Sequence, residues 1–392
     1  MNILIYSQHF WPEIFRINET ALELSKKNKV YVVSAWPNYN YKNKKNLLKY
    51  GFENYNKVKI LRVPTLRRGK GSNFSIILNY LSYILGAAFI NKRHLNNIKF
   101  DAIISYSTSP IYQVIPAIIF SKRFKIPLFL WVQDLWPQVI SDLNIIKNKF
   151  VLNILQKTVN YLYKNCDHLL AQSPQIEKIL FKKFKNTSLL YNPSNNLKFR
   201  KFKPQVQSTK KIVFAGNIGK AQNLEELIYY SKIVKNNNLN VKFIIIGEGS
   251  NKQQLVNLVK NKKLNNIIIF KNKMSLKKLD EYLIKADGLL VALGKGEALS
   301  VTLPAKFQTY LSYGKPIFSF SGNIVEEIVK KNNIGFILKK KNCKEIIYKF
   351  SKMHTRKQNL INKNCKNLFY KYFELRENTY NLLQIIRKKI QK

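Results

Sequence analysis

Acidic side chains are scarce in this sequence. Its 392 residues include 68 lysines and arginines but only 21 aspartates and glutamates, which gives a formal net charge of +47. An excess of this size is typical of proteins that meet a polyanion, either nucleic acid or an anionic membrane surface. No zinc-ligand spacing, RNP-like signature or basic-region heptad accompanies the charge, so we expect no nucleic acid partner. Because Lys and Asn are spread along the whole chain, compositional drift explains the charge equally well.

Cysteine is rare as well, and the chain contains only Cys166, Cys343 and Cys365. Their odd number, their wide separation and the lack of a CxxC pair argue against a disulfide framework and the common zinc motifs. This cysteine usage fits a reducing cytoplasm. The first ten residues run directly into a strand pattern without a basic segment and a cleavage site, so we expect no secretory signal.

Long apolar runs are missing. The most apolar segment, 76–90, has about 15 residues, whereas a membrane-spanning helix needs about 20. The basic segments 67–70 and 92–94 flank it. These flanks favour either a helix that lies in the membrane interface with its cations toward lipid headgroups, or an ordinary domain helix with basic ends. From the first interpretation we expect a cytoplasmic protein that is peripheral on the inner face of the bacterial cytoplasmic membrane.

The length and the hydrophobic content indicate two folded domains. The chain is longer than one hydrophobic core usually supports, and 46% of its residues are hydrophobic. Short β-branched runs alternate with helix-period stretches in two series, the pattern of βα units that form parallel sheets. Strands are expected at 2–7, 30–35, 59–63, 102–106, 127–132, 168–172 and 188–191 in the first series, and at 212–215, 243–246, 267–270, 289–293 and 317–320 in the second.

The two series predict an α/β protein with four parts. These are an N-terminal Rossmann-like domain over 1–195, a polar linker over 196–211, a C-terminal Rossmann-like domain over 212–365 and a long amphipathic helix over 366–392. In open α/β sheets ligands bind beyond the carboxyl ends of the strands. The residues that follow each strand are therefore the candidates for chemistry.

Two glycine turns follow strands of the second series. The first is the segment 215–222, with Gly216, Gly219 and Lys220, and the second is the segment 246–250. Glycine lets the backbone approach a phosphate, and the free N–H groups of a following helix attract an anion. A single turn of this kind is as often structural as functional, but a pair in one domain favours a nucleotide site.

A lysine stands at the expected start of a helix in the second domain. Within the segment 303–310, Pro304 opens the helix and Lys306 lies in its first turn. A cation at this end opposes the helix dipole, so a bound anion is one explanation for it. An exposed lysine in water is the other.

Two loops of the first domain carry polar groups between aromatic residues. The segment 130–138 ends an apolar strand with Gln133 and Asp134 between two tryptophans, and the opening segment 7–13 includes His9. Aromatic faces suit sugar rings, and the polar groups can bind hydroxyls or take a proton. Asp134 is equally suited to cap a helix, and His9 to be a buried structural histidine.

Three segments together resemble family 4 retaining glycosyltransferases of the GT-B fold. They are 10–18, with Phe-Trp-Pro-Glu and Phe-Arg-Ile-Asn, then 131–137, with Trp-Val-Gln-Asp-Leu-Trp-Pro, and 215–222, with Ala-Gly-Asn-Ile-Gly and Gln222. The resemblance spans nearly the whole chain. Within the family, the segments are similar to the subgroup that transfers N-acetyl-L-fucosamine during O-antigen and capsule assembly.

The resemblance implies a GT-B fold, in which two Rossmann-like domains face a cleft and the C-terminal helix crosses back to the N-terminal domain. It implies a hexosyltransferase that binds a UDP-sugar in the C-terminal domain and a polyprenyl-diphosphate-linked glycan in the N-terminal domain. Transfer would retain the anomeric configuration by front-face displacement, without a protein nucleophile, a metal or another cofactor.

The resemblance and the positions at strand ends together assign roles to individual residues. We expect catalytic roles for Gln133, Asp134 and Lys306, donor binding by Gly216, Asn217, Gly219, Lys220, Gln222, Gly247, Glu248, Glu297, Gln308 and Thr309, and acceptor binding by His9, Trp11, Glu13, Arg16 and Trp136.

Three positions depart from the family pattern. Many members have two glycines in the first loop, where this chain has 14–16, and many have histidine where Gln133 stands. The usual paired glutamates of the last nucleotide loop would fall at Val301 and Thr309. The ribose contact of those glutamates is then left to Glu297, which lies nearby in the sequence.

Two other functions remain open. A nucleotide-sugar 2-epimerase shares the GT-B architecture, but it would use acidic groups and histidines in the second domain, which has no histidine before His354. A non-catalytic basic binding protein with a degenerate cleft would explain the missing glutamates.

Overall fold

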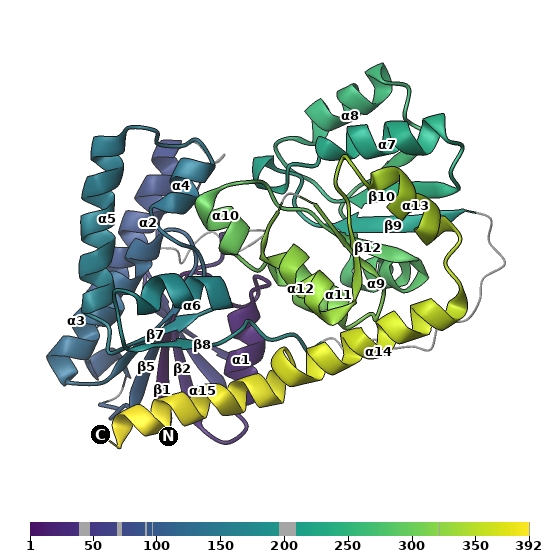
Figure 1. The fold of residues 1–392 in the computed structure, drawn as a ribbon. Coiled ribbons are helices and arrows are strands. Elements are labelled where there is room, and N and C mark those ends of the chain that lie inside the picture. Colours follow the sequence, from purple (N-terminus) through teal and green to yellow (C-terminus); the bar gives the residue numbers. More distant parts are fainter. Residues whose placement is uncertain are drawn as a thin grey trace. The chain divides into compact units, whose positions relative to one another are not determined.

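The computed structural model describes residues 1–38, 48–68, 73–90, 92–95, 97–195, 209–320 and 322–391 (Figure 1). The chain forms two units. Unit 1 comprises 1–193 and 374–392, and unit 2 comprises 194–373.

The sheet of unit 1 has eight strands in the order β3-β4-β2-β1-β5-β6-β7-β8. All neighbouring strands are parallel except β3 and β4, which are antiparallel. The central strands consist mostly of apolar residues that are buried on both faces, as expected for a parallel sheet between helices. The strands are β1 (Asn2–Tyr6), β2 (Lys29–Ala35), β3 (Gly51–Tyr55), β4 (Val58–Val63), β5 (Ala102–Ser107), β6 (Leu128–Val132), β7 (His168–Ala171) and β8 (Thr187–Leu189).

Helices cover both faces of this sheet. Ile3 and Ile5 pack in one cluster with residues of α1 and α15, whereas Tyr6, on the opposite face of the same strand, contacts Phe120 of α3. The helices are α1 (Arg16–Leu24), α2 (Asn73–Ala88), α3 (Ile115–Phe124), α4 (Gln138–Asp142), α5 (Lys149–Lys164), α6 (Pro174–Phe181) and α15 (Leu375–Ile390), with 3₁₀ turns η1 (Lys92–Leu95) and η2 (Ile111–Val114).

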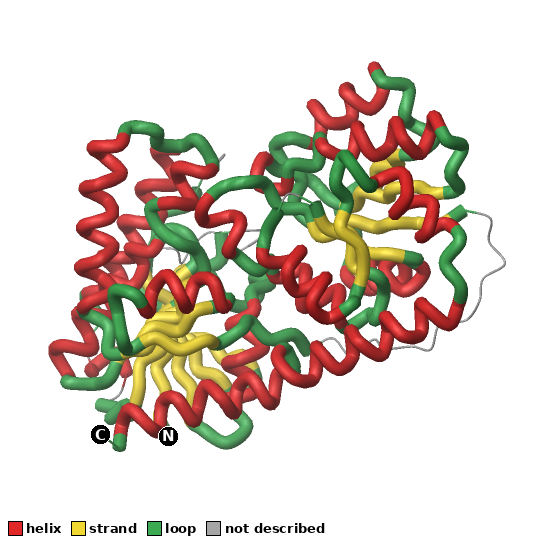
Figure 2. The backbone as a smooth tube through the Cα atoms, in the orientation of Figure 1, coloured by secondary structure: helices red, strands yellow, loops and turns green. Residues whose placement is uncertain are grey.

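The sheet of unit 2 has six parallel strands in the order β11-β10-β9-β12-β13-β14, again between helices (Figure 2). Its strands are β9 (Lys210–Ala215), β10 (Val241–Ile246), β11 (Ile268–Lys271), β12 (Gly288–Val291), β13 (Ile317–Ser319) and β14 (Gly335–Ile337). Its helices are η3 (Lys220–Gln222), α7 (Glu226–Asn236), α8 (Lys252–Asn261), α9 (Leu276–Lys285), α10 (Glu297–Val301), α11 (Ala305–Leu311), α12 (Ile324–Asn332), α13 (Cys343–Ser351) and α14 (Thr355–Tyr372).

The expected α/β class with two parallel-sheet, Rossmann-like domains is confirmed, and every expected strand is present within one or two residues of its expected bounds. Two strands were not expected. The edge strand β3, with the sequence Gly-Phe-Glu-Asn-Tyr, lacks a β-branched run, and β14 has only three residues. Both gain their strand conformation from pairing with a neighbour rather than from local preference.

The expected single terminal helix over 366–392 is wrong. The structure has α14 from Thr355 and α15 from Leu375, and the helical hydrogen bonding breaks at Phe373 and Glu374, where the Glu374 side chain accepts from the Glu377 N–H and caps α15. α14 belongs to unit 2 and α15 to unit 1, where it packs on α1. Most of the expected linker, 196–208, lies outside the described residues.

Candidate functional sites at the carboxyl ends of the two sheets

In unit 2, the glycine turns after β9 and β10 form one structure. A Cβ added to Gly247 would lie 1.9 Å from the Gly216 carbonyl oxygen, and one added to Gly249 would lie 2.3 Å from the Ile218 oxygen. Both glycines also have positive φ angles, of 149° and 158°. The Ile218 N–H donates to the Glu248 carbonyl at 2.8 Å. Gly247 and Gly249 are therefore required by the packing of one loop on the other, and the sequence did not reveal this contact.

Lys306 lies directly beside the first glycine turn. Its Nζ is 3.8 Å from the centre of the Phe214 ring, and a Cβ on Gly216 would lie 3.0 Å from that nitrogen. Gly216, with φ of 144°, thus leaves room for the ammonium group. Among the described residues, no carboxylate forms an ion pair with Lys306. Burial without such a partner lowers the pKa of Lys306 to about 7.

The position of Lys306 is set by the short helix α11. Pro304 is the N-cap of α11, and Lys306 is the second residue of the helix. At the other end of the helix, the Tyr310 hydroxyl accepts from the Ala215 N–H at 2.8 Å and donates to its carbonyl oxygen at 3.2 Å. This pair ties the helix to the end of β9. The lysine is thereby held against the loop that the sequence singled out.

Other predicted donor-binding residues have partners within the protein. The Gln222 amide oxygen accepts from the Gly219 N–H at 3.1 Å, which closes the 3₁₀ turn. Glu248 pairs with Lys252 at 2.8 Å, and this hydrogen bond lowers the pKa of Glu248. The Gln308 amide, turned so that its nitrogen faces carbonyl oxygens, donates to Pro304 at 2.8 Å, and the Thr309 hydroxyl donates within its helix. These contacts stabilise the 3₁₀ turn η3, the loop after β10 and helix α11.

The remaining predicted residues of unit 2 are exposed. Asn217 and Lys220 stand on the loop after β9, with Lys220 opening the 3₁₀ turn. Glu297 is the exposed first residue of α10, after Gly296. Unit 2 therefore brings Gly216, Asn217, Gly219, Lys220 and Lys306 to one end of its sheet.

In unit 1, His9 and Glu13 form a buried pair after β1. The Nδ1 of His9 lies 2.8 Å from a carboxylate oxygen of Glu13, and both side chains are almost fully buried. The His9 ring stacks on Phe15 at a centroid distance of 5.1 Å. The other Glu13 oxygen accepts from the Asn38 N–H at 2.8 Å. Glu13 thus fixes the plane of the His9 ring.

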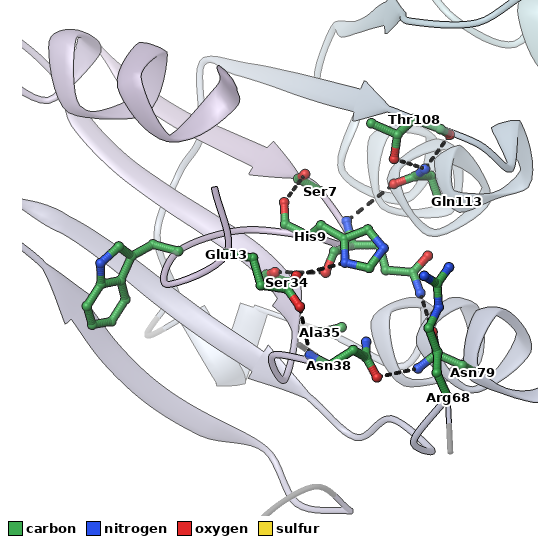
Figure 3. Close-up of polar contacts among 12 residues, drawn as sticks. Ser7, His9, Glu13, Ser34, Ala35, Asn38, Arg68, Asn79, Thr108 and Gln113 are labelled. Carbon is green, nitrogen blue, oxygen red and sulfur yellow. Dashed lines mark hydrogen bonds and ion pairs between the residues drawn. The ribbon is translucent and has the colours of Figure 1, made fainter. Parts of the chain in front are cut away.

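A network of buried amides continues from this pair (Figure 3). Asn79 of α2 donates to the Asn38 side chain at 3.1 Å and accepts from the Gln8 side chain at 3.0 Å. The Gln8 N–H donates to Gln113 of η2 at 3.3 Å. Sequence reasoning missed these residues. The signal was there for Asn79, an amide within an apolar helix, because such a group requires a buried hydrogen-bond partner.

Trp11 and Arg16 are held by neighbours within unit 1. The Trp11 ring stacks on the Tyr55 ring at a centroid distance of 4.9 Å. The backbone carbonyl of Trp11 accepts a hydrogen bond from Arg62. Arg62 is fully buried and also donates to Glu53 at 2.7 Å. Arg16 pairs with Glu19 at 3.3 Å. One face of the Trp11 ring is thus covered by the protein.

Asp134 and Trp136, in the loop after β6, both contact Ser109. The Ser109 hydroxyl donates to Asp134 at 2.8 Å and accepts from the Trp136 indole N–H at 3.0 Å. Burial raises the pKa of Asp134, although the hydrogen bonds from Ser109 oppose this shift. Asp134 does not cap a helix, because α4 begins at Gln138 with Pro137 as its N-cap. The capping alternative is therefore wrong, and the sequence showed no sign of Ser109.

The side-chain amide of Gln133 is only partly used by the described residues. Its amide oxygen accepts from Asn192 at 2.7 Å, but its amide nitrogen is buried and has no partner among the described residues. An unsatisfied buried N–H costs about 1–3 kcal/mol, so a ligand oxygen at this position would stabilise the site.

A known protein family matches the part of the chain that forms unit 2, whereas solved structures match the whole chain. Residues 195–367 match the family model described as Glycosyl transferases group 1. Unit 2 therefore contains a glycosyl transferases group 1 domain. No curated protein sequence matches the chain.

Solved structures of GT-B glycosyltransferases match the whole chain. One is sucrose-phosphate synthase (tll1590) from Thermosynechococcus elongatus, at 13% identity, covering 99% of this chain and 98% of that one, with a TM-score of 0.74. Another is Alr3699/HepE from Anabaena in complex with UDP and glucose, at 13% identity, 99% and 100% coverage and a TM-score of 0.67. A third is a glycosyltransferase from Rickettsia africae, at 14% identity, 100% and 99% coverage and a TM-score of 0.68. The fold of the chain is GT-B.

Two features of the described part of the chain bear on cofactors and on membranes. No three His, Cys, Asp or Glu side chains there are arranged to hold a metal ion. None of the helices there combines the length and the apolar character that crossing a bilayer requires.

Proposed function

We propose that this protein is a glycosyltransferase that binds a nucleotide-sugar donor through unit 2, with Lys306 as the contact to the donor diphosphate. The observation that carries the proposal is the ammonium group of Lys306, held beside Gly216 with no carboxylate partner among the described residues. A desolvated cation without a counter-charge is destabilising, and an anionic ligand removes that cost.

The surroundings of Lys306 support a diphosphate as this anion. The family match covers the lysine and the glycine turn, and one structural neighbour was solved with UDP and glucose and another with UDP-2-fluoro glucose. In a transfer reaction the bond between the anomeric carbon and the donor oxygen breaks, and charge develops on the departing diphosphate. A fixed cation at that oxygen lowers the barrier, and such preorganised charge is usually a large contribution to catalysis. The acceptor hydroxyl forms the new bond and loses its proton to the departing phosphate.

The finer assignment follows the family resemblance. We propose a UDP-sugar, most simply an N-acetylated deoxyhexose such as N-acetyl-L-fucosamine, as the donor, and a polyprenyl-diphosphate-linked glycan of O-antigen or capsule assembly as the acceptor. Transfer would proceed with retention and without a metal.

Unit 1 would bind the acceptor at the carboxyl end of its sheet. The unused amide nitrogen of Gln133 suits a sugar hydroxyl, and Asp134, with its raised pKa, can accept a hydrogen bond from one. The Glu13 carboxylate would keep His9 oriented toward the same ligand. Trp136 would contribute an aromatic face.

A lipid-linked acceptor implies a protein that works at a membrane surface. Helix α2 contains no charged residue and presents exposed apolar side chains at helical spacing. Together with Phe89, just beyond the helix, these side chains form an apolar stripe that consists of Phe74, Ile77, Leu81, Leu85 and Phe89. Exposed apolar stripes of this size commonly mark a binding surface. We propose peripheral association of this stripe with the inner face of the cytoplasmic membrane.

A panel of UDP-sugars tests the proposal. Each would be scored for thermal stabilisation of the full-length protein and for UDP release with a polyprenyl-diphosphate-sugar acceptor. We expect one sugar to stabilise the protein and to give acceptor-dependent UDP release, and Lys306→Met to lose both. The exposed Lys262→Met is the matched control. Absence of any nucleotide-sugar binding would exclude the transferase and favour a non-catalytic binding protein.

A further inference from the structure

A groove in unit 1 runs between helices α3 and α5, and one of its lining residues, Tyr112, contacts Trp136 of the candidate acceptor site. Its volume is about 650 Å³. The lining is mostly apolar, with Ile115, Ile118 and Ile119 from α3 and Tyr161 and Leu162 from α5. Ile118 and Leu162 form the buried floor, whereas Ile119 and Tyr161 are 44% and 63% exposed at the rim. Water therefore contacts an apolar channel between two helices.

A second cavity, of about 610 Å³, shares the lining residue Lys122 with this groove. Four lysines line it, namely Lys122, Lys125, Lys164 and Lys389. Among the described residues these lysines form no ion pairs. The single carboxylate in the lining, Asp167, accepts a hydrogen bond from the Leu128 N–H at 2.8 Å. The cavity therefore has a strong excess of positive charge.

The lysine cavity lies at the opposite edge of the sheet from the candidate acceptor site. Pro127 and Asp167, which line it, immediately precede β6 and β7, whereas Asp134 follows β6 at the carboxyl edge. Whatever binds in the cavity is therefore not the group that reacts. Burial and, to a smaller extent, the charge of Lys389 lower the pKa of the nearby His168.

Lys122 lines both the groove and the lysine cavity, so the apolar channel and the cationic pocket are neighbours. We propose that the two together bind one anionic phospholipid, with its phosphate among the lysines and an acyl chain in the α3–α5 groove. Free phosphate would leave the groove unused. A bilayer lipid fits better, because α3 packs against α2, which carries the exposed apolar stripe.

This inference concerns a regulatory or anchoring lipid and does not depend on the proposed transferase activity. Its test uses the full-length protein and three soluble probes, namely dihexanoyl phosphatidylglycerol below its micelle concentration, dihexanoyl phosphatidylcholine and inorganic phosphate. Binding would be measured by calorimetry at low salt. We expect phosphatidylglycerol to bind at least tenfold more tightly than either other probe, because only it has both a net negative charge and acyl chains.

Two variants divide the site into its parts. The triple change Lys122→Gln, Lys125→Gln and Lys164→Gln should weaken phosphatidylglycerol binding at least tenfold, and Ile119→Asn with Tyr161→Asn should weaken it while leaving phosphate binding unchanged. The matched control, Lys262→Gln, Lys277→Gln and Lys278→Gln, removes the same charge from exposed lysines of unit 2. Thermal melts and UDP-sugar binding, both expected to be unchanged, show that the variants are folded.

Three results would overturn the assignment. The first is an equal loss of binding in the pocket variant and the control variant, which would indicate diffuse charge. The second is phosphate binding as tight as that of phosphatidylglycerol. The third is tighter binding of farnesyl diphosphate, measured as a fourth probe, than of phosphatidylglycerol, which would assign the groove to the isoprenoid chain of an acceptor. A failure of UDP-sugar binding with lipid binding intact would count against the transferase alone.

Discussion

The ammonium nitrogen of Lys306 lies 3.8 Å from the centre of the Phe214 ring, at the end of the first strand of unit 2. An aromatic face partly compensates a cation that has lost water, at about 0.5–2 kcal/mol. It does not replace a carboxylate, and the pKa of the lysine accordingly remains low, at about 7. The pair therefore leaves a cation that can accept an anionic ligand.

The low pKa predicts that donor binding takes up a proton. The diphosphate of a UDP-sugar favours charged Lys306, and because it is a diester it does not itself titrate near neutral pH. At pH 8 binding should take up close to one proton, and at pH 6 almost none, and the affinity should fall by up to about tenfold per pH unit above 7. Calorimetry in buffers of different ionisation enthalpy measures this directly. Equal proton uptake by Lys306→Met would show that another group is responsible.

Replacing Lys306 should raise the stability of the protein at pH 6 and weaken its binding of UDP-sugars. Between pH 7 and the ordinary lysine pKa of 10.5, the unfolded chain keeps a proton that the folded chain releases, so stability rises with pH across this window and is lowest below pH 7. Lys306→Met should lack this rise and melt at a higher temperature than the parent at pH 6. The same variant should bind UDP-sugars about 10- to 100-fold more weakly, through loss of a charged contact. A variant that is less stable at pH 6 would contradict the assignment.

The contact between the two glycine turns predicts a sharp difference among glycines. Gly249→Ala places a Cβ against the Ile218 backbone and should lower the free energy of unfolding by about 2–4 kcal/mol. Gly322 is the matched control, because it also has a positive φ, of 67°, but no atom of the described residues lies within 4 Å of an added Cβ. Its change to alanine should cost about 1 kcal/mol. Urea unfolding of both variants makes the comparison, and equal losses would mean that the loops do not pack as described.

The His9–Glu13 pair predicts a loss of acceptor use without a loss of donor binding. Glu13→Gln keeps an oxygen for the Asn38 N–H but weakens the hold on the His9 ring, so acceptor-dependent turnover should fall about tenfold or more. Glu13→Ala leaves buried groups unpaired and should also destabilise the protein by about 1–3 kcal/mol. Thermal stabilisation by UDP-sugars should be unchanged in Glu13→Gln. A parallel loss of donor binding would indicate a general structural defect instead.

The exposed stripe of α2 predicts membrane binding that can be removed without unfolding. Leu81→Ser with Leu85→Ser should reduce flotation with vesicles that contain phosphatidylglycerol, because it removes apolar side chains that insert at the interface. Leu276→Ser with Leu360→Ser removes equally exposed leucines from unit 2 and should leave flotation unchanged. If both double variants float like the parent, the stripe is not the membrane contact.

Much of the candidate site could be located from the sequence, because ligands of α/β proteins gather where parallel strands end. The residues after β1, β6, β9 and β10 were found in this way, and Lys306 was found from its place at a helix start. Their partners could not be found. Ser109, which joins Asp134 to Trp136, and Phe214, which lies under Lys306, have no local feature that marks them.

The sequence by itself determined the α/β class and nearly every strand, because runs of β-branched residues bounded by turn residues are a local signal. Only the tertiary structure decided that the terminal helix divides into α14 and α15, since a helix break at Phe373 depends on what each half packs against. It also decided that Gly247 and Gly249 serve a contact between loops, and that Lys306 forms no ion pair with a carboxylate in the described part of the chain. Both are consequences of distances between residues far apart in the chain, and no local pattern encodes such distances.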